Sequence, residues 1–228
     1  MTPILVFGGL TSVSAARSAA EAASHASYYA PLAAELDARP RLADHRLELV
    51  AAGRAAYTAL IGHAILARGW ETQSFLELDA QLASPSLDAV EYRAWLDDNA
   101  VGYVAVDTSR MTTPESQLIG SGQLPYLRLI WSHAGWRLYE VLHPTPIVAR
   151  PARLEAWSQA TIRVQVPCAC RTLVRIRWSR FLTASPSLPA ETSDDVEDSF
   201  RPALARDPSG WTTLTTNGPG TYVLEGLL

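Results

Sequence analysis

Four residues of types that recognise sugars and phosphates lie close together in the sequence: His63, Arg68, Trp70 and Glu71. An Arg guanidinium can hold a phosphate or carboxylate through two parallel hydrogen bonds. An indole ring offers a flat face for a sugar, and a carboxylate accepts hydrogen bonds from its hydroxyls. We interpret this corner as a candidate site for a lipid-linked sugar or an envelope glycan. The alternative is that Trp70 is buried and an Arg68–Glu71 pair braces a helix corner.

A second candidate surface comes from an alternating segment. Arg171, Arg175 and Arg177 alternate with an apolar and threonine set, so a strand would place the three arginines on one face. Such a stripe could contact phospholipid headgroups or an anionic polymer. The alternative is the solvated face of a strand whose charges discourage edge pairing.

The two cysteines of the chain, Cys168 and Cys170, are separated by one residue. In an oxidising compartment they could form a disulfide, and two free thiols are the alternative. A zinc site needs about four ligands, and the His residues are scattered, so no metal site is expected. Glycine-rich phosphate-binding motifs and the HExxH metalloprotease motif are absent from the sequence, and no cofactor is expected.

Composition narrows the possible partners and the location. The formal net charge is −4, so nothing suggests nucleic acid as a partner. Residues 4–10 are apolar, but this stretch is far shorter than the ~20 residues that a membrane span requires. No basic residue precedes it, as a secretory signal would need. Read alone the chain is expected to be soluble, unless this stretch is the end of a longer membrane segment.

The first two thirds of the chain predict helices alternating with strands. Helices are expected over residues 28–39, 54–67, 71–82 and 86–99, with another beginning at Thr113-Pro114-Glu115. Pro31 should lie in the first turn of the first helix, Gly69 should stop the second, and Ser84-Pro85 should cap the fourth. Residues 46–51 form a strand candidate, and residues 101–106 read as a strand covered on both faces.

Two amphipathic strands close this part. Residues 126–132 and 136–142 should form a hairpin turning at residues 133–135. Period two places Leu127, Leu129 and Trp131 on one face, which we expect to pack against the helix over 86–99. The pattern predicts an α/β layer with a mixed sheet.

Beyond a proline-rich stretch the pattern becomes strand-like. Strands are expected over 160–166, 171–178, 211–216 and 221–225, with a long loop over 183–198. The predicted fold class is therefore an α/β part with a mixed sheet and helices, followed by a small all-β sandwich. The expected division is a lead-in or stalk over 1–26, an α/β domain over 27–146 and a β-sandwich domain over 147–228.

Four segments carry a resemblance to a known family. They are Ser27-Tyr-Tyr-Ala-Pro-Leu32, Ala67-Arg-Gly-Trp-Glu71, Tyr92-Arg-Ala-Trp-Leu-Asp-Asp-Asn-Ala-Val101 and Trp136-Arg-Leu-Tyr139. In this order they resemble the C-terminal soluble domain of multi-pass membrane proteins of GC-rich bacteria, of the actinobacterial type. Those proteins look like C-type glycosyltransferases, and some are described as 6-pyruvoyl-tetrahydropterin-synthase-related membrane proteins. The resemblance covers roughly residues 25 to 225.

The resemblance implies a role and a location. Because the catalytic carboxylates of C-type glycosyltransferases usually lie in the membrane half, it implies a non-catalytic accessory domain on the extracytoplasmic face of the membrane. The implied partners are transmembrane segments of the same or a neighbouring protein, and a polyprenyl-linked sugar or envelope glycan. The alternatives are an independent soluble carbohydrate-active enzyme and a protein-docking module for a membrane partner.

Overall fold

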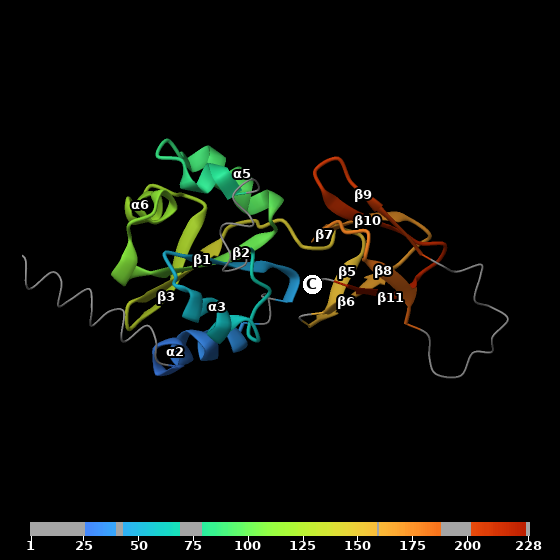
Figure 1. Cartoon of the computed structure of the whole chain (residues 1–228), viewed down its shortest axis with the longest axis horizontal. Helices are drawn as coiled ribbons and strands as arrows, with labels where there is room; N and C mark the ends of the chain where they lie inside the picture. The colour runs from blue at the N-terminus through green and yellow to red at the C-terminus, as the bar shows by residue number, and fades with distance from the viewer. Residues whose placement is uncertain (1–25, 40–42, 69–78, 159, 188–201, 227–228) are drawn as a thin grey trace, which may run out of the picture.

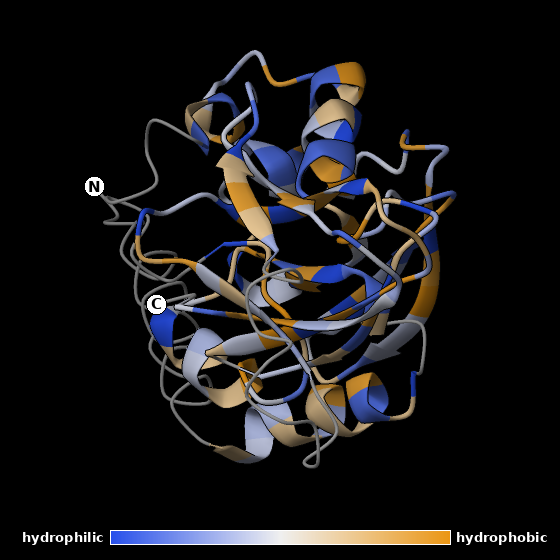
Figure 2. Ribbon diagram, turned by 90° about the vertical axis from the view of Figure 1, so that its right-hand side faces the viewer, coloured by the Kyte–Doolittle hydropathy of each residue, from blue (hydrophilic) through white to orange (hydrophobic). Residues whose placement is uncertain are grey.

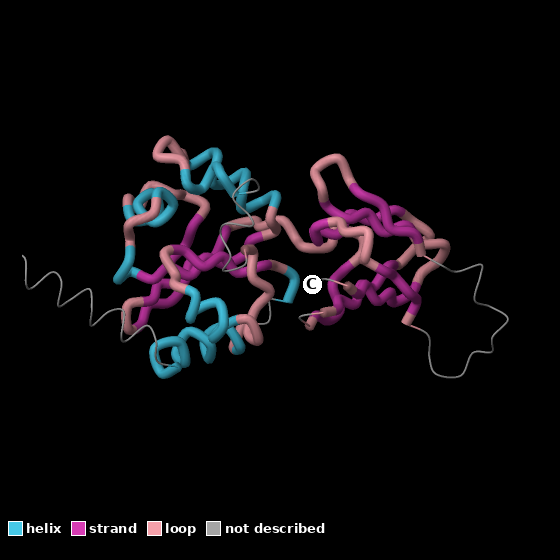
Figure 3. The backbone as a smooth tube through the Cα atoms, viewed as in Figure 1, coloured by secondary structure: helices cyan, strands magenta, loops and turns pink. Residues whose placement is uncertain are grey.

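The computed structural model describes residues 26–39, 43–68, 79–158, 160–187 and 202–226 of the chain. Two parts lie side by side in Figure 1. The first, called here the α/β half, consists of helices around a mixed four-stranded sheet, and the second, the β half, consists of two antiparallel sheets. The predicted fold class is confirmed. Figure 3 shows that the described helices are confined to the α/β half.

The mixed sheet has the strand order β1-β2-β4-β3. Its strands are β1 (Arg46–Val50), β2 (Val101–Asp107), β3 (Leu127–His133) and β4 (Trp136–Val141). The first two strands are parallel, and the hairpin of the last two joins β2 in the antiparallel sense. Every residue of β2 is buried, as expected for a central strand covered on both faces.

Helices cover both faces of this sheet, and each helix carries hydrophobic and hydrophilic residues (Figure 2). Helices α2 (Ala26–Asp37) and α3 (Arg54–Leu60) pack on one face, and α5 (Ala89–Asp98) and α6 (Pro114–Gly120) pack on the other. Side chains of β2 point alternately to the two faces of the sheet and so belong to two separate hydrophobic cores. Tyr103 and Ala105 point to the α2 and α3 side, whereas Val104 and Val106 point to the α5 and α6 side.

Two helix boundaries differ from the prediction. α3 ends at Leu60 rather than reaching residue 67, because the chain leaves the helix to pair with the free edge of β1. There Leu47 N–H donates to the carbonyl of Ile65 at 2.8 Å, and Ala67 N–H donates to the carbonyl of Leu47 at 2.9 Å. These bonds satisfy backbone groups that an edge strand would otherwise leave unpaired.

The second difference concerns α5, which begins after Asp88 and not after Ser84-Pro85. The Asp88 carboxylate accepts hydrogen bonds from the Val90 and Glu91 N–H groups, each at 2.8 Å, and the Glu91 side chain completes a capping box. The Asp88–Glu91 capping box satisfies more of the free N–H groups at the helix start than Ser84 could. In contrast, the predicted start of α6 is confirmed, with Thr113 as its N-cap.

The remaining helix predictions are only partly covered by the described residues. In α2, Pro31 lies in the second turn and not in the first. Of the helix predicted over 71–82, residues 71–78 lie outside the described residues, and Ala80–Ala83 forms the short 3-10 helix η2.

The hairpin forms where predicted, but one face of it is not as expected. Ala134 and Gly135 have φ angles of 47° and 90°, which is typical of a two-residue turn between antiparallel strands. The register between β3 and β4 shifts between Leu129 and Trp131. Leu129 is 52% exposed, and Trp131 packs with the α2 and α3 core. The prediction that Leu127, Leu129 and Trp131 share a face buried against α5 is therefore wrong, because a bulge breaks the period of two.

In the β half, two antiparallel sheets share one core, as in a sandwich. Their orders are β7-β10-β9 and β5-β6-β11-β8. The strands are β5 (Arg153–Trp157), β6 (Thr161–Val166), β7 (Arg171–Arg177), β8 (Thr183–Pro186), β9 (Ala203–Arg206), β10 (Trp211–Thr215) and β11 (Gly220–Glu225). The prediction missed β5, β8 and β9, and β8 falls where a loop was expected. Each of these three is short and lies at the edge of a sheet.

A buried arginine joins the two halves. Arg46, at the start of β1, donates a hydrogen bond to the carbonyl of Asn99 at 2.9 Å and another to the carbonyl of Arg175 in β7. Its guanidinium lies 5.5 Å from the centre of the Trp211 ring in β10. Because Asn99 is the C-cap of α5, the cation also interacts favourably with the negative end of that helix.

Candidate functional site

Arg68 points into the interior of the α/β half and contacts two buried carboxylates. It forms an ion pair with Glu48 of β1 and lies 3.4 Å from a carboxylate oxygen of Glu115 in α6. The three side chains are 12%, 1% and 7% exposed, respectively. Glu48 reaches this position because its neighbours Leu47 and Leu49 point to the opposite face of β1. We call this group the Glu48–Arg68–Glu115 cluster.

Aromatic side chains of α5 enclose the cluster. The Arg68 guanidinium lies 5.6 Å from the centre of the Trp95 ring, and Trp95 donates its indole N–H to Asp79 at 3.0 Å. Tyr92 stacks on Trp95, with ring centroids 6.4 Å apart. The cluster therefore lies between β1, α5 and α6, within a region that is otherwise apolar.

Burial shifts the protonation equilibria of the cluster. Burial raises the pKa of Glu48 to about 7, although Arg68 acts to lower it. Burial also opposes the charge of Arg68, but Glu48 first, then Tyr57 and Glu115, outweigh it and raise the Arg68 pKa. Within the described residues, Glu48 Oε2, Arg68 Nε and the Tyr92 hydroxyl have no hydrogen-bond partner. The arrangement thus contains a carboxyl group that can exchange a proton near neutral pH.

Of the four residues predicted to form a ligand site, His63, Arg68, Trp70 and Glu71, the described structure includes two, and these two lie apart. His63 forms a pair with Asp37 of α2, with 2.9 Å between Nδ1 and the carboxylate, and takes no part in the cluster. Trp70 and Glu71 lie outside the described residues. Arg68 does act as a brace, but with Glu48 and Glu115 as partners. The signal for Glu48 was present in the sequence as a lone acid in the middle of an apolar strand.

The three predicted stripe arginines have different surroundings. Arg171 is exposed, whereas Arg175 is half-buried and donates a hydrogen bond to the carbonyl of Pro146 at 2.9 Å. Arg177 is half-buried, and its guanidinium lies 3.6 Å from the centre of the Trp211 ring. Two of the three cations are thus engaged in contacts within the protein.

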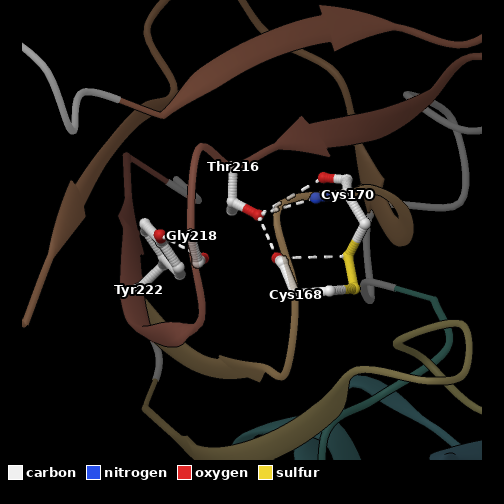
Figure 4. Close-up of a disulfide and its surroundings, with 5 residues drawn as sticks. All are labelled: Cys168, Cys170, Thr216, Gly218 and Tyr222. Carbon is white, nitrogen blue, oxygen red and sulfur yellow. Dashed lines mark hydrogen bonds between the residues drawn. A yellow bond between two sulfur atoms is a disulfide. The ribbon is translucent and has the colours of Figure 1, made fainter.

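Cys168 and Cys170 form a disulfide in the turn between β6 and β7 (Figure 4). The buried Thr216 holds the same turn from the end of β10. Its hydroxyl donates to the carbonyl of Cys168 at 3.0 Å and accepts a hydrogen bond from the Cys170 N–H at 3.4 Å. The turn is therefore fixed by side-chain hydrogen bonds as well as by the covalent bond.

Comparison of the chain with protein-family models, curated proteins and solved structures found no match. Within the described part of the chain, no helix is both long and apolar enough to cross a membrane. No group of three or more His, Cys, Asp or Glu side chains that could hold a metal ion occurs among the same residues.

Proposed function

We propose that this chain is a non-catalytic accessory domain of a membrane glycosyltransferase-like protein. In this proposal it lies at the extracytoplasmic face of the membrane and binds a glycan or a lipid-linked sugar. The observation that carries the proposal is the engagement of Arg68 by Glu48 and Glu115 in the interior. Because both carboxylates hold the Arg68 guanidinium inside the protein, this cation serves to position β1 and α6, which suits a scaffold better than a reaction centre.

The disulfide supports the proposed location. Disulfides persist in extracytoplasmic compartments and are rare in the reducing cytosol. A Cys168–Cys170 bond is therefore expected in a domain exposed to the oxidising side of the membrane. The resemblance to C-terminal domains of membrane proteins points to the same side.

The experiment measures ligand binding to the full chain. We expect polyprenyl-phosphate sugars or envelope glycans to quench tryptophan fluorescence saturably, with Trp70→Phe removing most of the change. Trp157→Phe is the matched control, because Trp157 lies in β5 of the β half. A wild-type signal that no ligand perturbs would contradict the binding role.

A second function is favoured by one specific observation. Glu48 and Glu115 are two carboxylates that contact the same guanidinium, and the pKa of Glu48 is raised to about 7. Glycoside hydrolysis uses two carboxyl groups, one of them an acid whose pKa is raised. Sugar release that is abolished by both Glu48→Gln and Glu115→Gln, in variants that remain folded, would establish the enzyme. Binding without sugar release supports the accessory domain.

A further inference from the structure

A fixed turn in the β half presents an aromatic ring to solvent. After β7 the chain forms a turn in which Leu182 N–H donates to the carbonyl of Ser179 at 3.1 Å. Arg180 and Phe181 occupy its two central positions, and Phe181 N–H donates to the Ser179 hydroxyl oxygen at 3.2 Å. Trp178, which precedes the turn, donates its N–H to the carbonyl of Gly210 at 3.0 Å. We call residues 178–181 the aromatic turn.

The exposure of this turn is selective. Phe181 is 68% exposed and Trp178 is 38% exposed, whereas the adjacent Leu182 is 8% exposed and anchors the turn in the protein. The other large apolar side chains that are exposed among the described residues, Ile61, Val90 and Leu129, belong to three separate segments of the α/β half. Isolated exposed apolar residues are ordinary, but two exposed aromatic residues three positions apart on one anchored turn are unusual.

One arginine belongs to the aromatic turn and two others lie near it. The Arg180 guanidinium lies 4.7 Å from the centre of the Phe181 ring. The Arg177 and Arg206 guanidinium groups lie beside Gly210, whose carbonyl accepts the Trp178 N–H. A Cβ atom added at Gly210 would lie 3.7 Å from Arg177 Nη1 and 3.9 Å from Arg206 Nη2. Two acids lie in this region. Asp207 accepts hydrogen bonds from Ser209 within its own turn. Glu225 pairs with Thr183 and precedes Gly226, whose backbone lies against the Phe181 carbonyl. Three arginines against Asp207 and Glu225 leave this surface a small positive excess, on a chain whose formal net charge is −4.

We infer that the aromatic turn docks the β half onto a membrane surface rich in anionic phospholipid. Trp and Phe rings enter the interfacial zone of a bilayer, and exposed Arg side chains meet lipid phosphates. Arg180 covers one face of Phe181, which leaves a single face of that ring for stacking on a sugar. This inference rests on the proposed membrane location but not on glycan binding. Glycan binding is measured by the Trp70-dependent titration, and docking is measured by vesicle sedimentation.

The test is sedimentation of the full chain with vesicles, comparing phosphatidylcholine alone with a phosphatidylcholine–phosphatidylglycerol mixture. We expect binding to the anionic vesicles, and Phe181→Ser should weaken it about tenfold through lost apolar burial. Arg180→Ser should weaken it about fivefold at low salt, with a smaller effect at high salt. Lipids with brominated acyl chains should quench tryptophan emission in wild type and much less in Trp178→Phe.

Two substitutions in the α/β half provide matched controls. Val90→Ser removes a side chain that is 76% exposed, and Arg128→Ser removes a cation that is 62% exposed. Both should bind vesicles within about twofold of wild type, since neither side chain would reach the bilayer. Wild type that stays in the supernatant, or controls that lose as much binding as the aromatic-turn variants, would overturn the inference. Trp178-dependent quenching by a soluble envelope glycan without vesicles would assign the turn to sugar instead.

Discussion

Trp211 of β10 donates its indole N–H to the carboxylate of Asp98 at 3.0 Å, a contact between residues 113 positions apart. Asp98 is the last residue of α5, so this bond joins the α/β half to the β half. Trp211 is 2% exposed, and the guanidinium groups of Arg46 and Arg177 lie 5.5 and 3.6 Å from the centre of its ring. Asp98 thus places a negative charge next to two cations that have lost much of their hydration.

This contact should couple the stability of the two halves. We expect Asp98→Ala to lower the free energy of unfolding by about 2 kcal/mol, because the hydrogen bond is charge-assisted. The double variant Asp98→Ala, Trp211→Phe should lose about 1 kcal/mol less unfolding free energy than the two single variants lose together. Asp97→Ala is the control: Asp97 pairs with Arg93 and lies 3.4 Å from the Thr145 hydroxyl, and because it is 36% exposed its removal should cost less, about 1 kcal/mol or below. Strict additivity in urea denaturation would show that the halves are not coupled here.

Glu48 should make stability depend on pH. Its pKa rises from an ordinary 4.5 to about 7 on folding, so the folded protein binds more protons between these values. The free energy of unfolding should therefore fall as pH rises from 4.5 to 8, by at most about 3 kcal/mol from this group. Glu48→Gln should remove this part of the slope, and Glu155→Gln, whose side chain is 42% exposed, should retain it. Identical pH profiles for the two variants would contradict the assignment.

The disulfide should contribute little to stability, because Cys168 and Cys170 enclose a loop of only three residues. We expect the Cys168→Ser, Cys170→Ser double variant to lose about 1–2 kcal/mol of unfolding free energy. Adding Thr216→Val to the double variant should lower the unfolding free energy further, since the Thr216 hydroxyl holds the same turn. Denaturation of the oxidised, reduced and substituted chains measures both contributions, and a loss of folding on reduction alone would contradict the prediction.

Leu129 and Leu138 provide a matched test of the hairpin. Leu129 is 52% exposed and Leu138 is fully buried at 0%. Leu129→Asp should change the unfolding free energy by no more than about 0.5 kcal/mol. Leu138→Asp should unfold the α/β half, because an unpaired charge in a core costs about as much as the whole stability. Equal thermal stability of the two variants would show that the described register is wrong.

Elements with strong local signals were predictable from the sequence. The continuous apolar run of β2 and the Thr-Pro-Glu start of α6 each contain most of the information that fixes them. The hairpin likewise followed from two amphipathic runs around Ala134-Gly135. The bulge near Leu129 was not predictable, because it depends on how β3 fits against β4 and the helices behind the sheet.

The candidate site was harder to predict, because it depends on contacts between distant segments. Arg68 was identified as a residue with possible chemistry, but its partners Glu48 and Glu115 lie 20 and 47 positions away. Those contacts require the parallel pairing of β1 with β2 and the position of α6 over the sheet. The aromatic turn was missed for a related reason, since the exposure of Phe181 depends on where Leu182 is buried.

The most direct test of the proposed accessory role is a titration of the full chain with a polyprenyl-phosphate sugar in detergent micelles. Tryptophan fluorescence and analysis of released sugar are followed in the same sample. The account predicts a saturable fluorescence change with no sugar released or transferred, unaltered by Glu48→Gln. Sugar release that is lost in Glu48→Gln, or the absence of any fluorescence change, would contradict it.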